Sequence, residues 1–80
     1  MKEKPVFLAG YGSIGSKQVS GFGECDIQLS RMAYGKHKFW SIAAWTQNGG
    51  YTGKCMTLRK ENMIALKDLL NSIDFDEIQD

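Results

Sequence analysis

The chain has 80 residues, a formal net charge of +1, two cysteines and one histidine, which is enough sequence for one small domain. Cys25 and Cys55 lie 30 positions apart and fit neither a C-x-x-C pair nor a four-ligand zinc set, so we expect no metal site. No stretch resembles a signal peptide or a membrane span, so we expect a cytoplasmic protein with reduced thiols.

The small net charge conceals a separation of charge along the chain. Residues 31–60 contain six lysines and arginines, no acidic residue and five of the nine aromatic residues. Residues 74–80, DFDEIQD, contain four of the nine acidic residues and no basic one. We expect this tail to be a solvated end. The alternative is that it docks replication or transcription proteins, or competes with a nucleic acid for the basic segment.

The first 24 residues are rich in glycine and lack helical periodicity. They predict a flexible, loosely extended arm over residues 1–24, with a short strand at residues 6–9. The segment AGYGSIGSK matches the G-x-G-x-x-G dinucleotide fingerprint, but two further glycines would break the helix that must follow it, at about 1 kcal/mol each. The chain is also too short for a doubly wound sheet, and we expect no cofactor.

Three strands are predicted after this arm. Residues 25–34 alternate apolar and polar side chains, residues 38–46 are rich in β-branched and aromatic residues, and residues 54–58 form a short third strand. The glycine-containing segments between them, GKHK and QNGGYTG, are typical of hairpin turns. The predicted strands therefore form an antiparallel sheet.

Residues 60–73 have helical periodicity, with apolar side chains at spacings of three and four. One helix on a small sheet cannot bury so wide an apolar face on one side, so we expect a second copy of the chain to cover it. Strands followed by one helix predict an α+β domain over residues 25–73. The predicted dimer interface consists of Met63, Ile64, Leu66, Leu69, Leu70 and Ile73.

The basic and aromatic middle of the chain offers the two groups that bind single-stranded nucleic acid without sequence preference: cations for the backbone and flat rings for the bases. Strand alternation puts Phe39 and Trp45 on one face and Trp40 and Ile42 on the other. We assign the Ile42 face to a core beneath the helix and the Trp45 face to the ligand. His37 has no nucleophilic partner at a catalytic spacing, and the acidic residues cluster in the tail, so we expect no enzyme.

Three segments read, in order, SIAAW, NGGYTGKCMTL and RKENMIALKDLL. They resemble the positive cofactor 4 family of transcriptional coactivators and their short bacterial and phage relatives. In that family a strand ends in Ile-Arg-Glu followed by Trp or Tyr, and a polar loop, a Gly-Lys-Gly segment and a terminal helix come after it. The resemblance covers residues 25–73. Ala43 stands where the family has arginine, and Cys55 stands where it has the second glycine of Gly-Lys-Gly.

The resemblance implies a curved four-stranded antiparallel sheet, one C-terminal helix and a homodimer formed through the helices. It also implies sequence-independent binding of single-stranded DNA or melted duplex in replication, recombination or transcription. It favours a bacterial or phage protein, or a nuclear one if the source is eukaryotic. A protein-interaction module built on the helix and the tail, and an RNA-binding protein, remain alternatives. The candidate DNA-binding residues are Arg31, Tyr34, Lys36, His37, Lys38, Phe39, Trp45, Lys54, Arg59 and Lys60.

Overall fold

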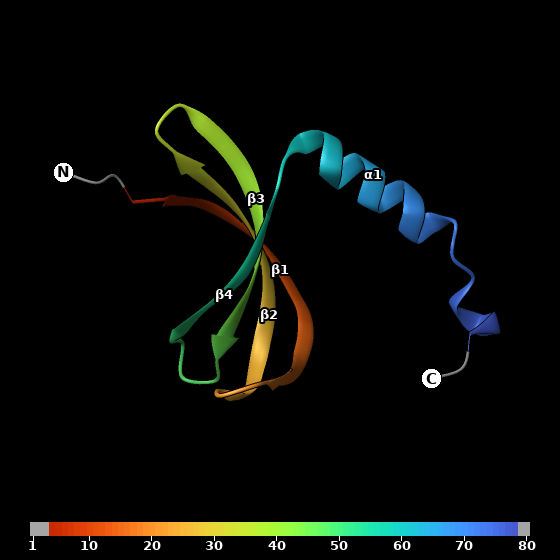
Figure 1. The fold of residues 1–80 in the computed structure, drawn as a ribbon, viewed down its shortest axis with the longest axis horizontal. Helices are drawn as coiled ribbons and strands as arrows, with labels where there is room; N and C mark the ends of the chain where they lie inside the picture. The colour runs from red at the N-terminus through yellow and green to blue at the C-terminus, as the bar shows by residue number, and fades with distance from the viewer. Residues whose placement is uncertain (1–3, 79–80) are drawn as a thin grey trace.

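A computed structural model describes residues 4–78, which form one antiparallel sheet of four strands in the order β1-β2-β3-β4, followed by a helix (Figure 1). This confirms the predicted α+β arrangement of a four-stranded antiparallel sheet and one C-terminal helix. A single turn of 3₁₀ helix follows in the acidic tail. The elements are β1 (Val6–Val19), β2 (Gly23–Tyr34), β3 (His37–Thr46), β4 (Tyr51–Leu58), α1 (Lys60–Asn71) and η1 (Phe75–Glu77).

The first strand, β1 (Val6–Val19), contains the short strand predicted at residues 6–9 and corrects the prediction of a flexible arm, which is wrong for residues 10–19. This segment pairs with β2 along its length, and the register shifts at three places, the signature of β-bulges. Gly12 and Gly15 lie at two of these places with φ values of +136° and +109°, which only glycine adopts without strain. The bulges interrupt the alternation that marks a strand in a sequence. The sheet therefore includes a strand outside the predicted domain of residues 25–73, and residues 1–3 of the predicted arm lie outside the described residues.

The central strands β2 and β3 pair without interruption from Cys25 with Thr46 to Tyr34 with His37. A two-residue turn joins them, and its Gly35 has a φ of +61°. Strand β4 begins at Tyr51, three residues earlier than predicted, because part of the expected loop pairs with β3 across a register shift. The β2–β3 pairing fixes which side chains share a face of the sheet.

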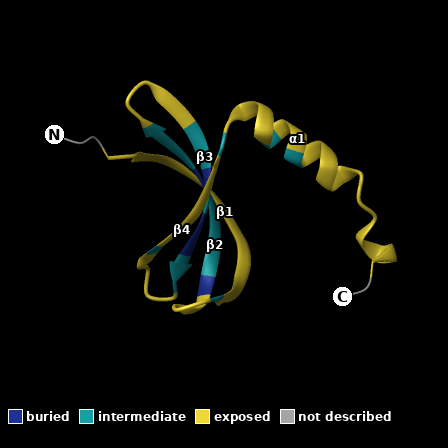
Figure 2. Ribbon diagram, viewed as in Figure 1, coloured by how far each residue is buried: buried dark blue, intermediate teal, exposed yellow. Residues whose placement is uncertain are grey.

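The core of the described residues is built from small side chains in the two central strands (Figure 2). Its buried residues are Cys25, Ser30, Ser41, Ala43 and Ala44. Figure 1 shows α1 running away from the sheet, and none of its residues is buried. The predicted core beneath the helix is therefore only partly formed, because most of the helix lies beyond the sheet rather than over it.

Candidate functional site

The sheet is curved, and its concave face carries a hollow of about 380 Å³ to which all four strands contribute. In β3 the residues on this face alternate with those on the opposite, convex face, as β-strand geometry requires. We call this hollow the concave groove. Its aromatic and large apolar lining residues are Phe7, Met32, Phe39, Trp45 and Tyr51.

Two of these rings form a pair where β3 ends and β4 begins. The centroids of Trp45 and Tyr51 lie 5.0 Å apart with their planes at 41°. A hydrogen bond with the side chain of Cys55, and partial burial, raise the pKa of the Tyr51 hydroxyl above its usual 10.0, so the phenol is neutral at physiological pH. The Trp45 Nε1 atom is shielded from solvent, and no described residue accepts a hydrogen bond from it. The groove thus presents uncharged aromatic rings.

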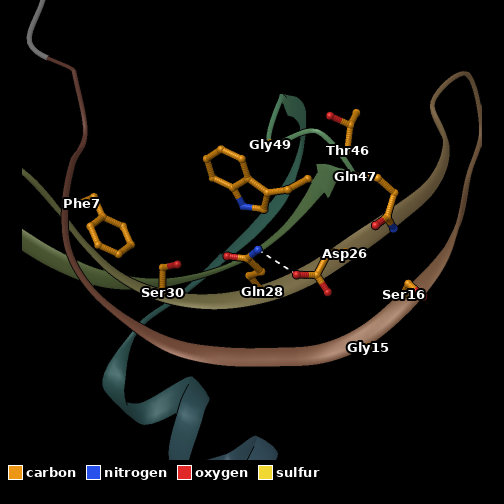
Figure 3. A pocket seen from close by; sticks show the side chains of 10 residues that line it. Phe7, Gly15, Ser16, Asp26, Gln28, Ser30, Thr46, Gln47 and Gly49 are labelled. Atoms are coloured by element: carbon orange, nitrogen blue, oxygen red, sulfur yellow. Dashed lines mark hydrogen bonds between the residues drawn. The ribbon is translucent and has the colours of Figure 1, made fainter.

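A second, polar hollow of about 700 Å³ adjoins the concave groove and shares Phe7, Ser30 and Trp45 with it. Figure 3 shows its side chains on the inside of the curved strands, with Asp26 and Gln28 joined by a hydrogen bond. Ser13 Oγ donates to Asp26 Oδ1, and Gln28 Nε2 donates to Asp26 Oδ2 at 2.8 Å. These two hydrogen bonds lower the pKa of Asp26 below 3.8, and the bond from Ser13 has the larger effect. The carboxylate is therefore ionised at neutral pH.

Basic side chains gather at the other end of the sheet. The start of β3 and the junction between β4 and α1 line a common hollow there, which contains His37, Lys38, Arg59 and Lys60, with Glu61 as its acidic lining residue. Lys36 lies in the adjacent β2–β3 turn, and Lys4, just before β1, lines the concave groove. We call these six residues the basic end: Lys4, Lys36, His37, Lys38, Arg59 and Lys60.

The structure brings most of the predicted DNA-binding residues together. Phe39 and Trp45 line the concave groove, and Tyr34 pairs with His37 further along the same face. The cations of the β2–β3 turn and of the β4–α1 junction form the basic end.

Three predicted residues lie on the convex face. Lys38 is one of them, because it alternates with Phe39 in β3, although it also lines the hollow of the basic end. Arg31 pairs with Trp40 on the convex face, and its guanidinium lies 3.7 Å from the centre of the Trp40 ring. Lys54 precedes Cys55, a residue of the groove, so alternation directs Lys54 to the opposite face.

A protein of Treponema pallidum (strain Nichols), described as uncharacterized, is 33% identical to this chain over 63 residues, which is 78% of this chain and 73% of that protein. The chain belongs to the same family as this treponemal protein. No protein-family model matches the chain, and no solved structure gives a significant match. Within residues 4–78, no helix is long and apolar enough to cross a membrane.

In this member of the family, sequence reasoning missed residues of both the concave groove and the polar hollow. Phe7 was missed because its predicted short strand was assigned to an arm outside the binding domain, and Tyr51 because it fell in a predicted loop. Asp26 and Gln28 were expected on the polar side of a strand, but nothing in the alternation shows that this side is concave. The sequence did contain a signal for Tyr51, because this residue belongs to the aromatic cluster of residues 31–60.

The residues predicted to form a dimer interface lie on α1 and just after it. Met63 and Leu66 are half-buried, and the other four are exposed. The exposed fractions are 48% for Ile64, 64% for Leu69, 47% for Leu70 and 39% for Ile73. The helix therefore presents a row of apolar side chains that this single chain does not cover.

Proposed function

We propose that the protein binds single-stranded DNA through the concave groove, largely without regard to sequence, in replication, recombination or transcription. Bases stack on the rings of the groove, and the backbone runs past the basic end. The observation that carries this proposal is the gathering of aromatic side chains from β1, β3 and β4 in one groove that leads to a cluster of cations. We assign the groove a binding role and no catalytic step.

Physical chemistry supports this assignment. Stacking of a base on an aromatic side chain contributes about 1–3 kcal/mol and tolerates any base, since every base has a flat face. A net charge of +1 attracts a polyanion weakly, but clustered cations create a local positive field. The resemblance to the positive cofactor 4 family supports the same assignment.

We further propose that the protein acts as a homodimer joined through α1. The uncovered apolar residues Ile64, Leu69 and Leu70 support this, because a second copy would remove them from water. The small core supports it too, since a domain of this size commonly gains stability by association.

The test is a fluorescence titration of the full chain with a labelled single-stranded oligonucleotide of mixed sequence across a salt series. We expect binding that weakens as salt rises, and a loss of at least about 1–3 kcal/mol in Trp45→Ala, the range for one stacking contact. The matched control is Phe75→Ala, which removes a ring that is 61% exposed and lies outside the sheet, and which should bind like the unmodified chain. Circular dichroism verifies that both variants fold.

Three outcomes would count against the proposal. Absent or salt-independent binding would favour a protein-interaction module built on the helix and the tail. Tighter binding of an RNA competitor of the same sequence would favour the RNA alternative. Equal losses in Trp45→Ala and Phe75→Ala would show that the groove is not the binding surface.

A further inference from the structure

We propose that the polar hollow beside Trp45 is a base-recognition pocket that prefers guanine, with Asp26 accepting two hydrogen bonds from the Watson–Crick edge of the base. The inference rests on the proposed function and refines it. Binding along most of the groove does not depend on the DNA sequence, and the base at one position of the bound DNA strand is recognised.

The placement of Asp26 next to an aromatic ring is the first support. Asp26 and Trp45 are partners in the β2–β3 register, and such partners have Cβ atoms about 4.5–5.5 Å apart on the same face of the sheet. Both line the polar hollow, and Figure 3 shows Asp26 on the inside of the curved sheet. A base stacked on Trp45 therefore has its edge within reach of this carboxylate.

The second support is the way the carboxylate is held. Ser13 and Gln28 each donate a hydrogen bond to one of its oxygens, which fixes its orientation before a ligand arrives. An ionised carboxylate has about four acceptor positions, so two donors leave room for two more. The site is thus a pre-oriented acceptor with spare capacity on both oxygens.

The edges of the bases differ in how well they match such an acceptor. Guanine presents two adjacent donors, N1–H and the N2 amino group, which suit the two oxygens of a carboxylate. Thymine presents one N–H between two carbonyl oxygens, and a carboxylate repels those oxygens. Adenine and cytosine each offer one amino group beside a ring acceptor. Guanine is therefore the preferred occupant and thymine the least favoured one.

The charge of the groove favours a base over a phosphate at this position. The carboxylate of Asp26 repels phosphate, whereas the basic end lies at the opposite end of the sheet. A bound strand consequently keeps its backbone away from Asp26 while the base enters. The pocket that recognises a base is therefore separate from the cations that bind the DNA backbone.

The test compares four oligonucleotides of equal length: all thymine, and the same strand with one central guanine, inosine or cytosine. We expect the guanine strand to bind at least about five-fold tighter than the all-thymine strand, as one good bidentate contact implies. Inosine, which lacks the 2-amino group, should fall between them. In Asp26→Asn the guanine advantage should disappear while binding of the all-thymine strand is retained. The matched control Glu24→Gln, which removes a carboxylate of β2 outside the hollow, should keep the advantage.

The outcomes separate this inference from the proposed function. If the chain binds all four strands equally well, the inference fails and the proposed function stands. If it binds none of them, the proposed function fails. A guanine advantage that survives in Asp26→Asn also overturns the inference. Should that variant fail to fold, guanine and inosine binding equally to the unmodified chain would overturn it.

Discussion

At the scale of single residues, the contact between Arg31 and Trp40 changes the role expected of a cation. The guanidinium lies 3.7 Å from the ring centre on the convex face, away from the concave groove. An arginine over an indole is stabilised by the negative face of the ring and shields it from water. The structure thus gives Arg31 a role in packing. Among the described residues, no side chain of the basic end makes a similar contact with an aromatic ring.

Replacing Arg31 tests this difference. Arg31→Gln should lower the free energy of unfolding by about 0.5–2 kcal/mol, the range for a cation–π contact, and leave affinity for single-stranded DNA unchanged. Urea denaturation followed by tryptophan fluorescence measures the first quantity, and the oligonucleotide titration measures the second. Lys54→Gln, a change on the same face, should shift stability by no more than about 0.5 kcal/mol. If the variant has lower affinity for single-stranded DNA and an unchanged free energy of unfolding, Arg31 belongs to the binding surface after all.

At the scale of elements, α1 is an element with few packing contacts to the rest of its own chain. Its first turn is held by a hydrogen bond from the backbone N–H of Arg59 to the Asn62 side chain at 3.1 Å. Beyond that turn its apolar side chains find few neighbours, because the helix runs away from the sheet (Figure 1). Helices of this length depend on tertiary packing for stability, which is the physical basis of the proposed dimer.

Charging the uncovered apolar row should separate the two subunits. In Leu69→Lys combined with Leu70→Lys, we expect a monomer by sedimentation equilibrium at concentrations where the unmodified chain is a dimer. Each buried leucine contributes about 1.5–3 kcal/mol, and the symmetry of a dimer doubles the loss. Glu77→Lys, which introduces the same side chain in η1 and outside α1, should remain dimeric. A monomeric unmodified chain would contradict the proposed dimer.

At the scale of the whole molecule, the distribution of charge matters more than its sum. The net charge is +1, yet the cations of the basic end lie together while the acidic residues of the described tail lie beyond α1 (Figure 1). A strand approaching such a molecule is drawn to one end of the sheet. The long-range part of the binding free energy should therefore come from a few identifiable lysines.

Removing two of these lysines should reduce the salt dependence of binding. In Lys36→Gln combined with Lys60→Gln, the slope of log K against log salt concentration should fall by about 0.7 for each lost phosphate contact on a single strand. Lys67→Gln, a lysine of α1 outside the basic end, should keep the original slope. A slope unchanged in the double variant would place the phosphates elsewhere on the protein.

Much of this fold follows from periodicity, and its failures have identifiable causes. The spacing of Met63, Leu66 and Leu70 predicted the helix. Alternation predicted the strand of residues 25–34, the β-branched and aromatic content of residues 38–46 predicted the next strand, and alternation put Phe39 and Trp45 on one face. Strand β1 was predicted only at residues 6–9, because its bulges shift the alternation, and Phe7 was not assigned to the site. The direction of α1 and the curvature of the sheet depend on contacts between distant segments, which no local pattern contains.

The bulges of β1 have one more consequence, for the solubility of the sheet. β1 is an edge strand of 14 residues, and a long regular edge offers unpaired N–H and C=O groups to which a strand of another molecule could add. Three register shifts break the regular spacing of those groups, so an incoming strand meets no continuous ladder. The glycine-rich segment that resembles a cofactor loop thus protects the molecule against growth into open-ended sheet aggregates.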